Sequence, residues 1–355
     1  MDNIKIRSAK IVGVTSCIPS ESVDNIGMAQ SIGIPNPQRT IDYIGIFRRR
    51  VASRDLMISD LAVCAINYLL DKLNWDKSTI DGILLITQTP DRKVPATACH
   101  LHRRLDLNKN CFAFDINLGC SAYPYGLWIA QQLMDGQSIK RILLVVGDMN
   151  SLYQDNQSTT SLLFGDAATA TALEMDEPKD AIDQEDIVIL GTDGSGEGAI
   201  EVDHCLPYQL DCADEIFKKP VIRMDGPAVA SFALRTVPTL IRALDHARYN
   251  NSNLSAERHD YYLLHQANAA LLTNIGRKAG IDFNRLPINT YEYGNTASAS
   301  IPLLITTSLA PVVTKSRLSL AMIGFGTGLS WSAISKEIGP LVVADTIEYQ
   351  TNVNQ

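Results

Sequence analysis

The segment Phe112–Met134 constrains the fold more than any other part of this chain of 355 residues. Its first part, Phe112–Ile116, is apolar and β-prone, and Gly119 permits a sharp turn. Over Tyr125–Met134 the apolar residues recur at helical spacing, and Gly136 provides a stop signal. This pattern predicts a buried strand, a tight turn and a helix.

Cys120 follows the turn and stands at the first position of the predicted helix. A helix N-terminus carries partial positive charge and unpaired N–H groups, so it favours a thiolate over a thiol and can hold an oxyanion. The sequence therefore makes Cys120 a candidate nucleophile. The alternative is a buried cysteine that packs as a small hydrophobic side chain, because cysteine is among the most buried residue types.

Strands alternate with helices along the whole chain, which is typical of an α/β fold with largely parallel sheets covered by helices. An acidic stretch at 176–186 connects two halves, which we place at 1–178 and 187–355. Residues 20–57 are expected to be irregular and polar, with the basic run Arg48–Arg50 on a solvated face. Strands are predicted at 10–18, 82–87, 112–116, 142–146, 187–191, 261–265, 318–323 and 329–338, and helices at 59–74, 96–105, 120–134, 227–247, 268–280 and 296–310.

Composition narrows the classes of function. The net charge of −8 argues against a nucleic-acid binder, whose footprint is basic. No run reaches membrane-spanning length and no stretch resembles a signal peptide, so we expect a cytoplasmic protein without a membrane segment. The seven cysteines form no CxxC pair, which favours reduced thiols. The side chains of Cys99–His102 would diverge on a helix, so no metal site is expected.

Two further polar residues stand at junctions between a strand and a helix. His265 ends an apolar strand shortly before Asn268, which is a good cap for the next helix. Asn295 comes directly before another predicted helix. Sites in α/β proteins are built at the carboxyl ends of strands, so Cys120, His265 and Asn295 are expected to lie together. The alternatives are a core histidine bonded to backbone and an asparagine that makes a turn.

The chain has two glycine-rich segments with different expected roles. Gly324–Gly328 could suggest a phosphate-binding loop, but a dinucleotide fingerprint should open a helix, whereas Leu329–Ile334 has the pattern of a strand. We therefore predict a tight turn there that brings backbone N–H groups close to another group. Asp193–Gly198 is predicted to be a loop, and it is not a nucleophile elbow because Asp193 occupies the place of the first glycine.

Together these features resemble the type III 3-oxoacyl-[acyl-carrier-protein] synthases of the thiolase-like superfamily, over nearly the whole chain. The resemblance implies a thiolase-like fold, with two similar α/β halves whose mixed sheets are covered by helices in five layers (αβαβα). Any one motif is weak, and the resemblance rests on their joint occurrence in this order. The motifs are Thr89–Asp91, Phe114–Asn117, Gly119–Ser121, Leu162–Asp166, Asp193–Gly196, His265–Asn268, Tyr293–Thr296 and Gly324–Gly328.

The family's Cys-His-Asn triad falls on Cys120, His265 and Asn295. By this resemblance, Cys120 takes an acyl group from a thioester and forms an acyl-enzyme by a ping-pong route. His265 and Asn295 then donate hydrogen bonds to the carbonyl of a malonyl thioester, which gains negative charge as carbon dioxide leaves. The carbanion attacks the acyl group on Cys120, and that oxyanion is expected between the N–H of Cys120 and a backbone N–H of Gly326 or Thr327.

The resemblance also implies substrates and partners. The first substrate is an acyl thioester of coenzyme A or of acyl carrier protein, the second is malonyl-acyl carrier protein, and no cofactor is needed. A homodimer in fatty-acid or related biosynthesis is implied, and the apolar strand Cys111–Ile116 could pair across a two-fold axis. Arg277 and Lys278 stand where family members carry basic residues that meet the carrier protein. The alternative for these two is an exposed helix end whose cations match its dipole.

The chain departs from the family at several positions. Arg39–Ile46 has no Trp where many members stack one on the adenine of coenzyme A, and Ala270 stands where many carry Arg. Ala122 replaces the usual Gly beside the nucleophile. Val94 stands where members place a larger residue that closes the acyl pocket of the partner subunit. A smaller side chain at Val94 predicts a deeper pocket and an acyl group of medium length.

Other functions stay open. The same superfamily includes enzymes that only transfer an acyl group to an alcohol or amine, and others that condense without a carrier protein. A Cys-His pair could also serve a thioesterase. A catalytically silent partner subunit is the alternative from another class, and the intact Cys, His and Asn argue against it.

Overall fold

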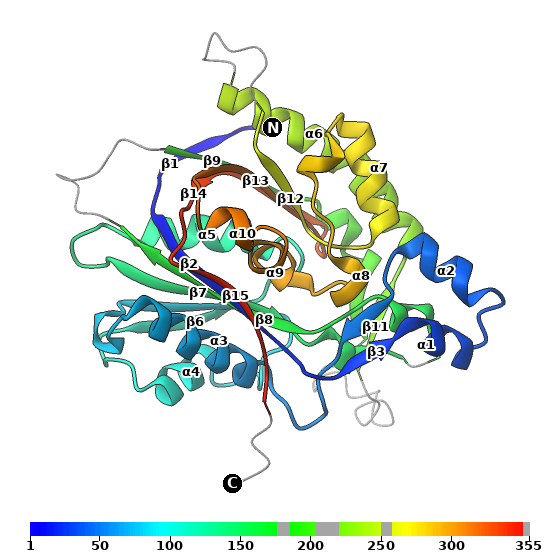
Figure 1. The fold of residues 1–355 in the computed structure, drawn as a ribbon, viewed down its shortest axis with the longest axis horizontal. Coiled ribbons are helices and arrows are strands. Elements are labelled where there is room, and N and C mark those ends of the chain that lie inside the picture. The colour runs from blue at the N-terminus through cyan, green and yellow to red at the C-terminus, as the bar shows by residue number, and fades with distance from the viewer. Residues whose placement is uncertain (156, 176–184, 204–219, 250–257, 351–355) are drawn as a thin grey trace.

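Two β-sheets lie face to face, with helices between them and on both outer sides, as the computed structural model in Figure 1 shows. The structure describes residues 1–155, 157–175, 185–203, 220–249 and 258–350. The predicted connection at 176–186 therefore lies largely outside the described residues.

The first sheet contains β2 (Lys10–Ile18), β5 (Gly82–Ile86), β6 (Phe112–Ile116), β7 (Arg141–Asp148), β8 (Ala167–Glu174) and β15 (Val343–Glu348). Their order is β15-β2-β8-β7-β5-β6, so β6 is an edge strand. β5, β6 and β7 run parallel, whereas β8 is antiparallel to both β7 and β2. The carboxyl ends of β5, β6 and β7 therefore meet at one edge of the sheet.

The second sheet contains β1 (Ile4–Arg7), β9 (Glu185–Thr192), β12 (Tyr261–Leu264), β13 (Leu318–Gly326) and β14 (Ser330–Ile338). Its order is β1-β9-β14-β13-β12. β12 and β13 are parallel, and β13 and β14 form the hairpin that the sequence predicts.

Three hydrophobic layers hold the elements together. The central core joins both sheets to α5 (Ala122–Leu133) and α9 (Ser300–Thr307) between them. A second core packs α3 (Ile58–Leu73) and α4 (Thr97–Leu105) on the outer face of the first sheet. A third packs α6 (Gly226–Tyr249) and α7 (Ala269–Ala279) on the outer face of the second sheet. The order α-β-α-β-α confirms the predicted five-layer thiolase-like fold (Figure 1).

The two sheets exchange their terminal strands. β1, from the start of the chain, pairs with β9 in the second sheet, and β15, near its end, pairs with β2 in the first. The division into 1–178 and 187–355 stays a prediction, and each half contributes one terminal strand to the other's sheet.

Residues 20–57 are more regular than we predicted. They contain α1 (Asn25–Ser31), α2 (Pro37–Ile44), β3 (Ser22–Asp24) and β4 (Arg48–Arg50). The expectation of a solvated basic run is wrong for Arg49, whose side chain is 1% exposed. Its guanidinium donates to Asn25 Oδ1 (2.7 Å) and to the carbonyl of Phe164 (2.9 Å), and burial lowers its pKa to about 10.

Two other predictions differ from the structure. The helix that we placed at 296–310 consists of a 3-10 turn (Ala297–Ala299), α9 and α10 (Ala310–Val313). α5 begins at Ala122 with Ser121 as its cap, so Cys120 precedes the helix and is not its first residue. The remaining elements are α8 (Thr290–Tyr293), the hairpin β10 (Ile200–Asp203) and β11 (Val221–Met224), and 3-10 turns at Lys77–Thr79, Asn150–Tyr153, Thr159–Leu162, Gly194–Ala199 and Phe283–Arg285.

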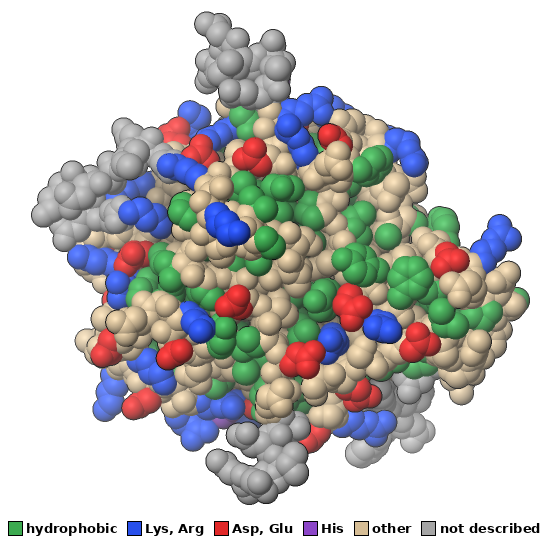
Figure 2. Space-filling view, in the orientation of Figure 1, with side chains coloured by type: hydrophobic (Ala, Val, Ile, Leu, Met, Phe, Trp, Pro, Cys, Tyr) green, Lys and Arg blue, Asp and Glu red, His purple; other side chains and the backbone are tan. Residues whose placement is uncertain are grey.

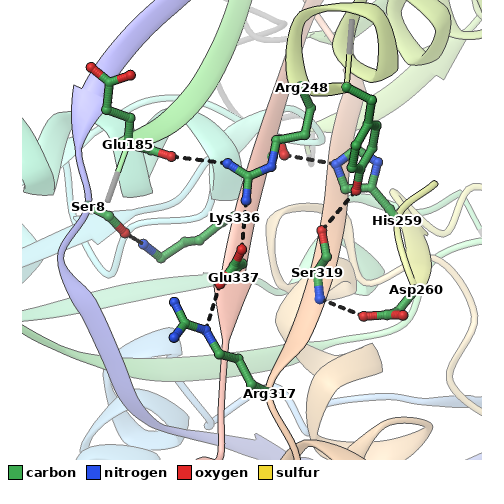
Figure 3. Close-up of polar contacts among 11 residues, drawn as sticks. Ser8, Glu185, Arg248, His259, Asp260, Arg317, Ser319, Lys336 and Glu337 are labelled. Carbon is green, nitrogen blue, oxygen red and sulfur yellow. Dashed lines mark hydrogen bonds and ion pairs between the residues drawn. The ribbon is translucent and has the colours of Figure 1, made fainter. Parts of the chain in front are cut away.

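Polar contacts hold the carboxyl-terminal end of β14, which is the end of the strand away from Cys120. Figure 3 shows Lys336 reaching Ser8, and Arg248 of α6 and Arg317 both contacting Glu337 of β14. The Lys336 ammonium also pairs with Asp186 at 2.6 Å, and both side chains are fully buried. These bonds join β14 to the segment between β1 and β2, where the chain passes from one sheet to the other.

Acidic and basic side chains are interspersed over the face seen in Figure 2, and hydrophobic side chains gather there over α8. Phe47 and Tyr291, on α8, are among the exposed aromatic residues. Across the described ranges, none of the helices combines the length and apolarity needed to cross a membrane.

Candidate active site

A cavity of about 480 Å³ brings together the residues that the sequence singled out. Cys120, His265 and Asn295 all line it, and so do Gly326 and Thr327 of the glycine-rich turn. Cys120 comes from the turn after β6, His265 from the end of β12, and Asn295 from the loop after α8. Strand ends from both sheets therefore meet at one site.

Gly326 lies directly against Cys120. A Cβ placed on Gly326 would be 2.6 Å from Cys120 Cβ and 3.0 Å from Cys120 Sγ, so only glycine allows this approach. The strained φ of +158° at Gly326 adds to the requirement. The turn at Gly324–Gly328 is thus a close contact with the candidate nucleophile, as the sequence indicated.

Cys120 is a neutral thiol in this environment. Burial raises the pKa of the Cys120 thiol to about 12, and the nearby carboxyl of Asp148 acts in the same direction. The N–H groups of Cys120 and Thr327 and the Thr327 hydroxyl oppose this shift. The preference for a thiolate that a helix N-terminus was expected to give is outweighed here, because desolvation raises the pKa more than the donors lower it.

His265 is buried and neutral, because burial lowers its pKa to about 4. Its Nδ1 lies 2.9 Å from Ser300 Oγ, and the Ser300 hydroxyl donates to the carbonyl of Ala297 at 2.9 Å. Since that hydroxyl has one hydrogen, Ser300 Oγ must accept from Nδ1. The imidazole hydrogen is thus assigned to Nδ1, which leaves a lone pair on Nε2.

Asn295 is held with its amide group free to donate. The N–H of Ala297 donates to Asn295 Oδ1 at 2.9 Å. This bond identifies the oxygen of the carboxamide and leaves its NH₂ group as a donor for a ligand. The backbone of Asn295 pairs with the motif Leu162–Asp166, through Leu163 O (2.8 Å) and Gly165 N (3.0 Å). This pairing explains physically why the two motifs occur together.

Asp148 is a site residue that our sequence reasoning missed. It is fully buried and accepts hydrogen bonds from the N–H of Gln88 (2.7 Å) and from the N–H of Ser298 (3.1 Å). Burial raises the pKa of Asp148 to about 6. It thus connects the loop after β5 to the loop that carries Asn295. The available signal was an acidic residue at the end of the apolar strand 142–146.

The other predicted residues lie away from Cys120. Val94 is 83% exposed in this single chain and does not line the cavity. Arg277 and Lys278 are exposed near the end of α7, one turn beyond Asn274, which does line the cavity. Among the described residues, no cluster of three or more His, Cys, Asp or Glu side chains could hold a metal ion.

A five-layer fold with a thiol, a neutral imidazole and a free carboxamide on one cavity defines a thiolase-like condensing enzyme. Residues 114–194 match the family described as "3-Oxoacyl-[acyl-carrier-protein (ACP)] synthase III", and residues 249–338 match its C-terminal domain. The chain belongs to the 3-oxoacyl-[acyl-carrier-protein] synthase III family.

Curated relatives and solved structures agree with this assignment. The chain is 31% identical to a beta-ketoacyl-[acyl-carrier-protein] synthase III of Lactococcus lactis over 91% of this chain and 97% of the relative. It is 30% identical to the synthase III of Neisseria meningitidis, over 92% of this chain and 98% of that protein. A crystal structure of a 3-oxoacyl-(acyl-carrier protein) synthase from Burkholderia xenovorans matches with a TM-score of 0.88 and 39% identity, over 98% of this chain and 99% of that one. The enzyme is therefore an acyl-transferring condensing enzyme.

Proposed function

We propose that this enzyme joins an acyl group, carried on Cys120, to the malonyl unit of malonyl-acyl carrier protein in a decarboxylative Claisen condensation. The observation that carries the proposal is the shared cavity of Cys120, His265 and Asn295, with an open lone pair on His265 Nε2 and an open NH₂ on Asn295. The substrates supply the remaining chemistry, and no cofactor takes part.

The first half-reaction loads Cys120. His265 Nε2 accepts the thiol proton as Sγ attacks the thioester carbonyl, because a thiol with a pKa of about 12 needs a base. The bond to the leaving thiol breaks, and that sulfur recovers the proton from His265. The oxyanion lies between the N–H groups of Cys120 and of Gly326 or Thr327.

The second half-reaction forms the carbon–carbon bond. The NH₂ of Asn295 donates to the malonyl thioester carbonyl as carbon dioxide leaves, and His265 donates as well once Nε2 has taken a proton from water, because its first proton left with the departing thiol. The enolate carbon then attacks the acyl carbonyl, and the Cys120 Sγ–carbon bond breaks. The Cys120 thiolate takes up the proton on His265 Nε2, so the condensation consumes one proton from water in all.

The partners of the reaction follow from the same proposal. Arg277 and Lys278 are exposed on α7, one turn beyond Asn274, which lines the cavity, and they offer positive charge to an acidic carrier protein. A second copy of the chain covers the β6 edge and brings Val94 to its partner's acyl pocket, which is consistent with the high exposure of Val94. The enzyme acts in the cytoplasm in fatty-acid or related biosynthesis.

Intact-protein mass spectrometry tests the loading step. Mixing with an acyl thioester should add the mass of the acyl group to wild type and not to Cys120→Ala. Adding malonyl-acyl carrier protein to the loaded enzyme should then release the acyl group as a 3-oxoacyl product. Release only by water, an alcohol or an amine would instead assign a thioesterase or a simple acyltransferase.

A further inference from the structure

The cavity at Cys120 has two chemically different walls. One comes from the loops that follow the parallel strands β5 and β7, and it presents Gln88, Asn150 and Tyr153. The second half lines the rest of the cavity with a group of apolar side chains and with the polar side chains of Glu201, Asn268 and Asn274. The apolar group includes Met224, Val229, Ala230, Leu234 and Leu271.

The polar wall has unused hydrogen-bonding capacity. Asn150 is only 6% exposed, yet its carboxamide makes no hydrogen bond to any described residue. The side chains of Gln88 and Tyr153 likewise have no hydrogen-bond partner within the described ranges. The polar side-chain atoms of these three residues keep some solvent accessibility. Because the residues line the cavity, we infer that these atoms face it. A buried, unpartnered carboxamide is costly unless a ligand or water satisfies it.

This wall lies next to the reacting atoms. A Cβ on Gly119, the residue before Cys120, would collide with Gln88 Oε1, so the Gln88 carboxamide packs on the backbone beside the nucleophile. The N–H of Gln88 is fixed by Asp148, which holds this loop in place. An acyl chain attached to Cys120 Sγ therefore begins beside the Gln88 carboxamide, in the cavity that Asn150 and the apolar residues also line.

We propose that the acyl group loaded on Cys120 carries a neutral oxygen substituent, a hydroxyl or a ketone, that bonds to Asn150 and Gln88. The proposal rests on the proposed function, because it assumes that Cys120 is acylated. A carboxamide offers both donors and an acceptor, so it can bond to a hydroxyl or to a ketone, and no Lys or Arg among the described residues lines the cavity to neutralise an anion. A plain alkyl chain would displace water from these amides without replacing its hydrogen bonds, and the site should discriminate against it.

The test compares pantetheine thioesters of equal chain length with and without oxygen. Rates of Cys120 acylation are measured by intact mass for hexanoyl-, 3-hydroxyhexanoyl- and 5-oxohexanoyl-pantetheine. We expect at least one oxygenated thioester to react about tenfold faster than hexanoyl. Equal rates, or a preference for hexanoyl, would overturn the inference and leave the proposed function intact. Absence of acylation by all three would count against the proposed function itself.

Variants of similar size locate the effect. Asn150→Leu should remove most of the preference, lowering the rate with the oxygenated thioester and raising it with hexanoyl. Asn274→Leu makes the same chemical change on α7, where the Asn274 oxygen already accepts from Arg277 (3.0 Å), and should keep the wild-type ratio. If the ratio of acylation rates with oxygenated and plain thioesters stays unchanged in both Asn150→Leu and Gln88→Leu, these carboxamides do not select the acyl group.

Discussion

Proton transfer governs the chemistry at Cys120, because burial holds its thiol in the neutral form. Cys120→Ser should abolish condensation, since a hydroxyl is far less acidic than even this raised thiol and its ester is less reactive. Assay of 3-oxoacyl product formation, with circular dichroism as the control for folding, decides this. Condensation near the wild-type rate would remove Cys120 as the nucleophile.

His265 gives the acylation step a defined pH dependence. Its pKa of about 4 means that Nε2 is a free base above that pH and is lost as a base when the pH falls through about 4. The wild-type acylation rate should therefore be flat from about pH 6 to 9. In His265→Ala the thiol must ionise unaided, so the rate should rise about tenfold per pH unit toward the Cys120 pKa. A flat profile in that variant would assign the base to another group.

Asn295 belongs to the second half-reaction, because its open NH₂ is a donor and not a base. Asn295→Ala should slow decarboxylation by about 10²–10³-fold, the usual effect of removing one oxyanion donor. Acylation of Cys120 should change far less. Single-turnover measurement of carbon dioxide release and of the acyl adduct separates the steps, and an equal loss in both would contradict the assignment.

At the scale of single elements, β6 presents an unpaired apolar edge. It is the last strand of the first sheet, Phe114 is 38% exposed, and the rings of Phe112 and Phe114 stack at 6.1 Å. Such an edge is normally covered in a native assembly. Phe114→Glu should therefore weaken a homodimer by placing a charge in its interface.

Sedimentation at micromolar concentration measures this effect. Phe283→Glu is the matched control, because Phe283 is 50% exposed on a 3-10 turn that packs against Gly276 of α7, on the second sheet, and should leave the association unchanged. A wild-type monomer, or a Phe114→Glu dimer of unchanged affinity, would remove β6 as the subunit contact.

Over the whole molecule, local sequence patterns predicted most helices and strands. They did not predict the contacts between elements that are distant in the sequence. The sequence pattern found α6, which buries one apolar stripe, and the β13–β14 hairpin, whose strands are apolar runs buried on both faces. The exchange of β1 and β15 between sheets depends on pairing across more than 150 residues, which no local pattern contains. The neutral states of Cys120 and His265 likewise depend on burial by segments that are distant in the sequence. Arg49 looked solvated for the same reason, since its partners lie elsewhere in the chain.

The buried ion pair Lys336–Asp186 lies where the chain passes from one sheet to the other. We expect it to contribute more to the free energy of unfolding than the exposed ion pairs nearby. Lys336 Nζ contacts Asp186 (2.6 Å) and also the carbonyl of Ala9 (2.7 Å), between β1 and β2. Lys336→Met would leave the Asp186 charge buried and unpaired, at a cost of about 3–5 kcal/mol. Lys5→Met removes an exposed ion pair with Glu185, and that change should cost about 0–1 kcal/mol.

Denaturant unfolding of both variants beside wild type measures these two costs. Replacing the pair together, in Lys336→Met/Asp186→Leu, should recover most of the loss, because no buried charge then remains. Recovery would assign the destabilisation of Lys336→Met to the orphaned carboxylate. A double variant as unstable as the single one would instead assign it to the bonds that Lys336 makes to Ser8 and Ala9, and thus to the crossing between the sheets.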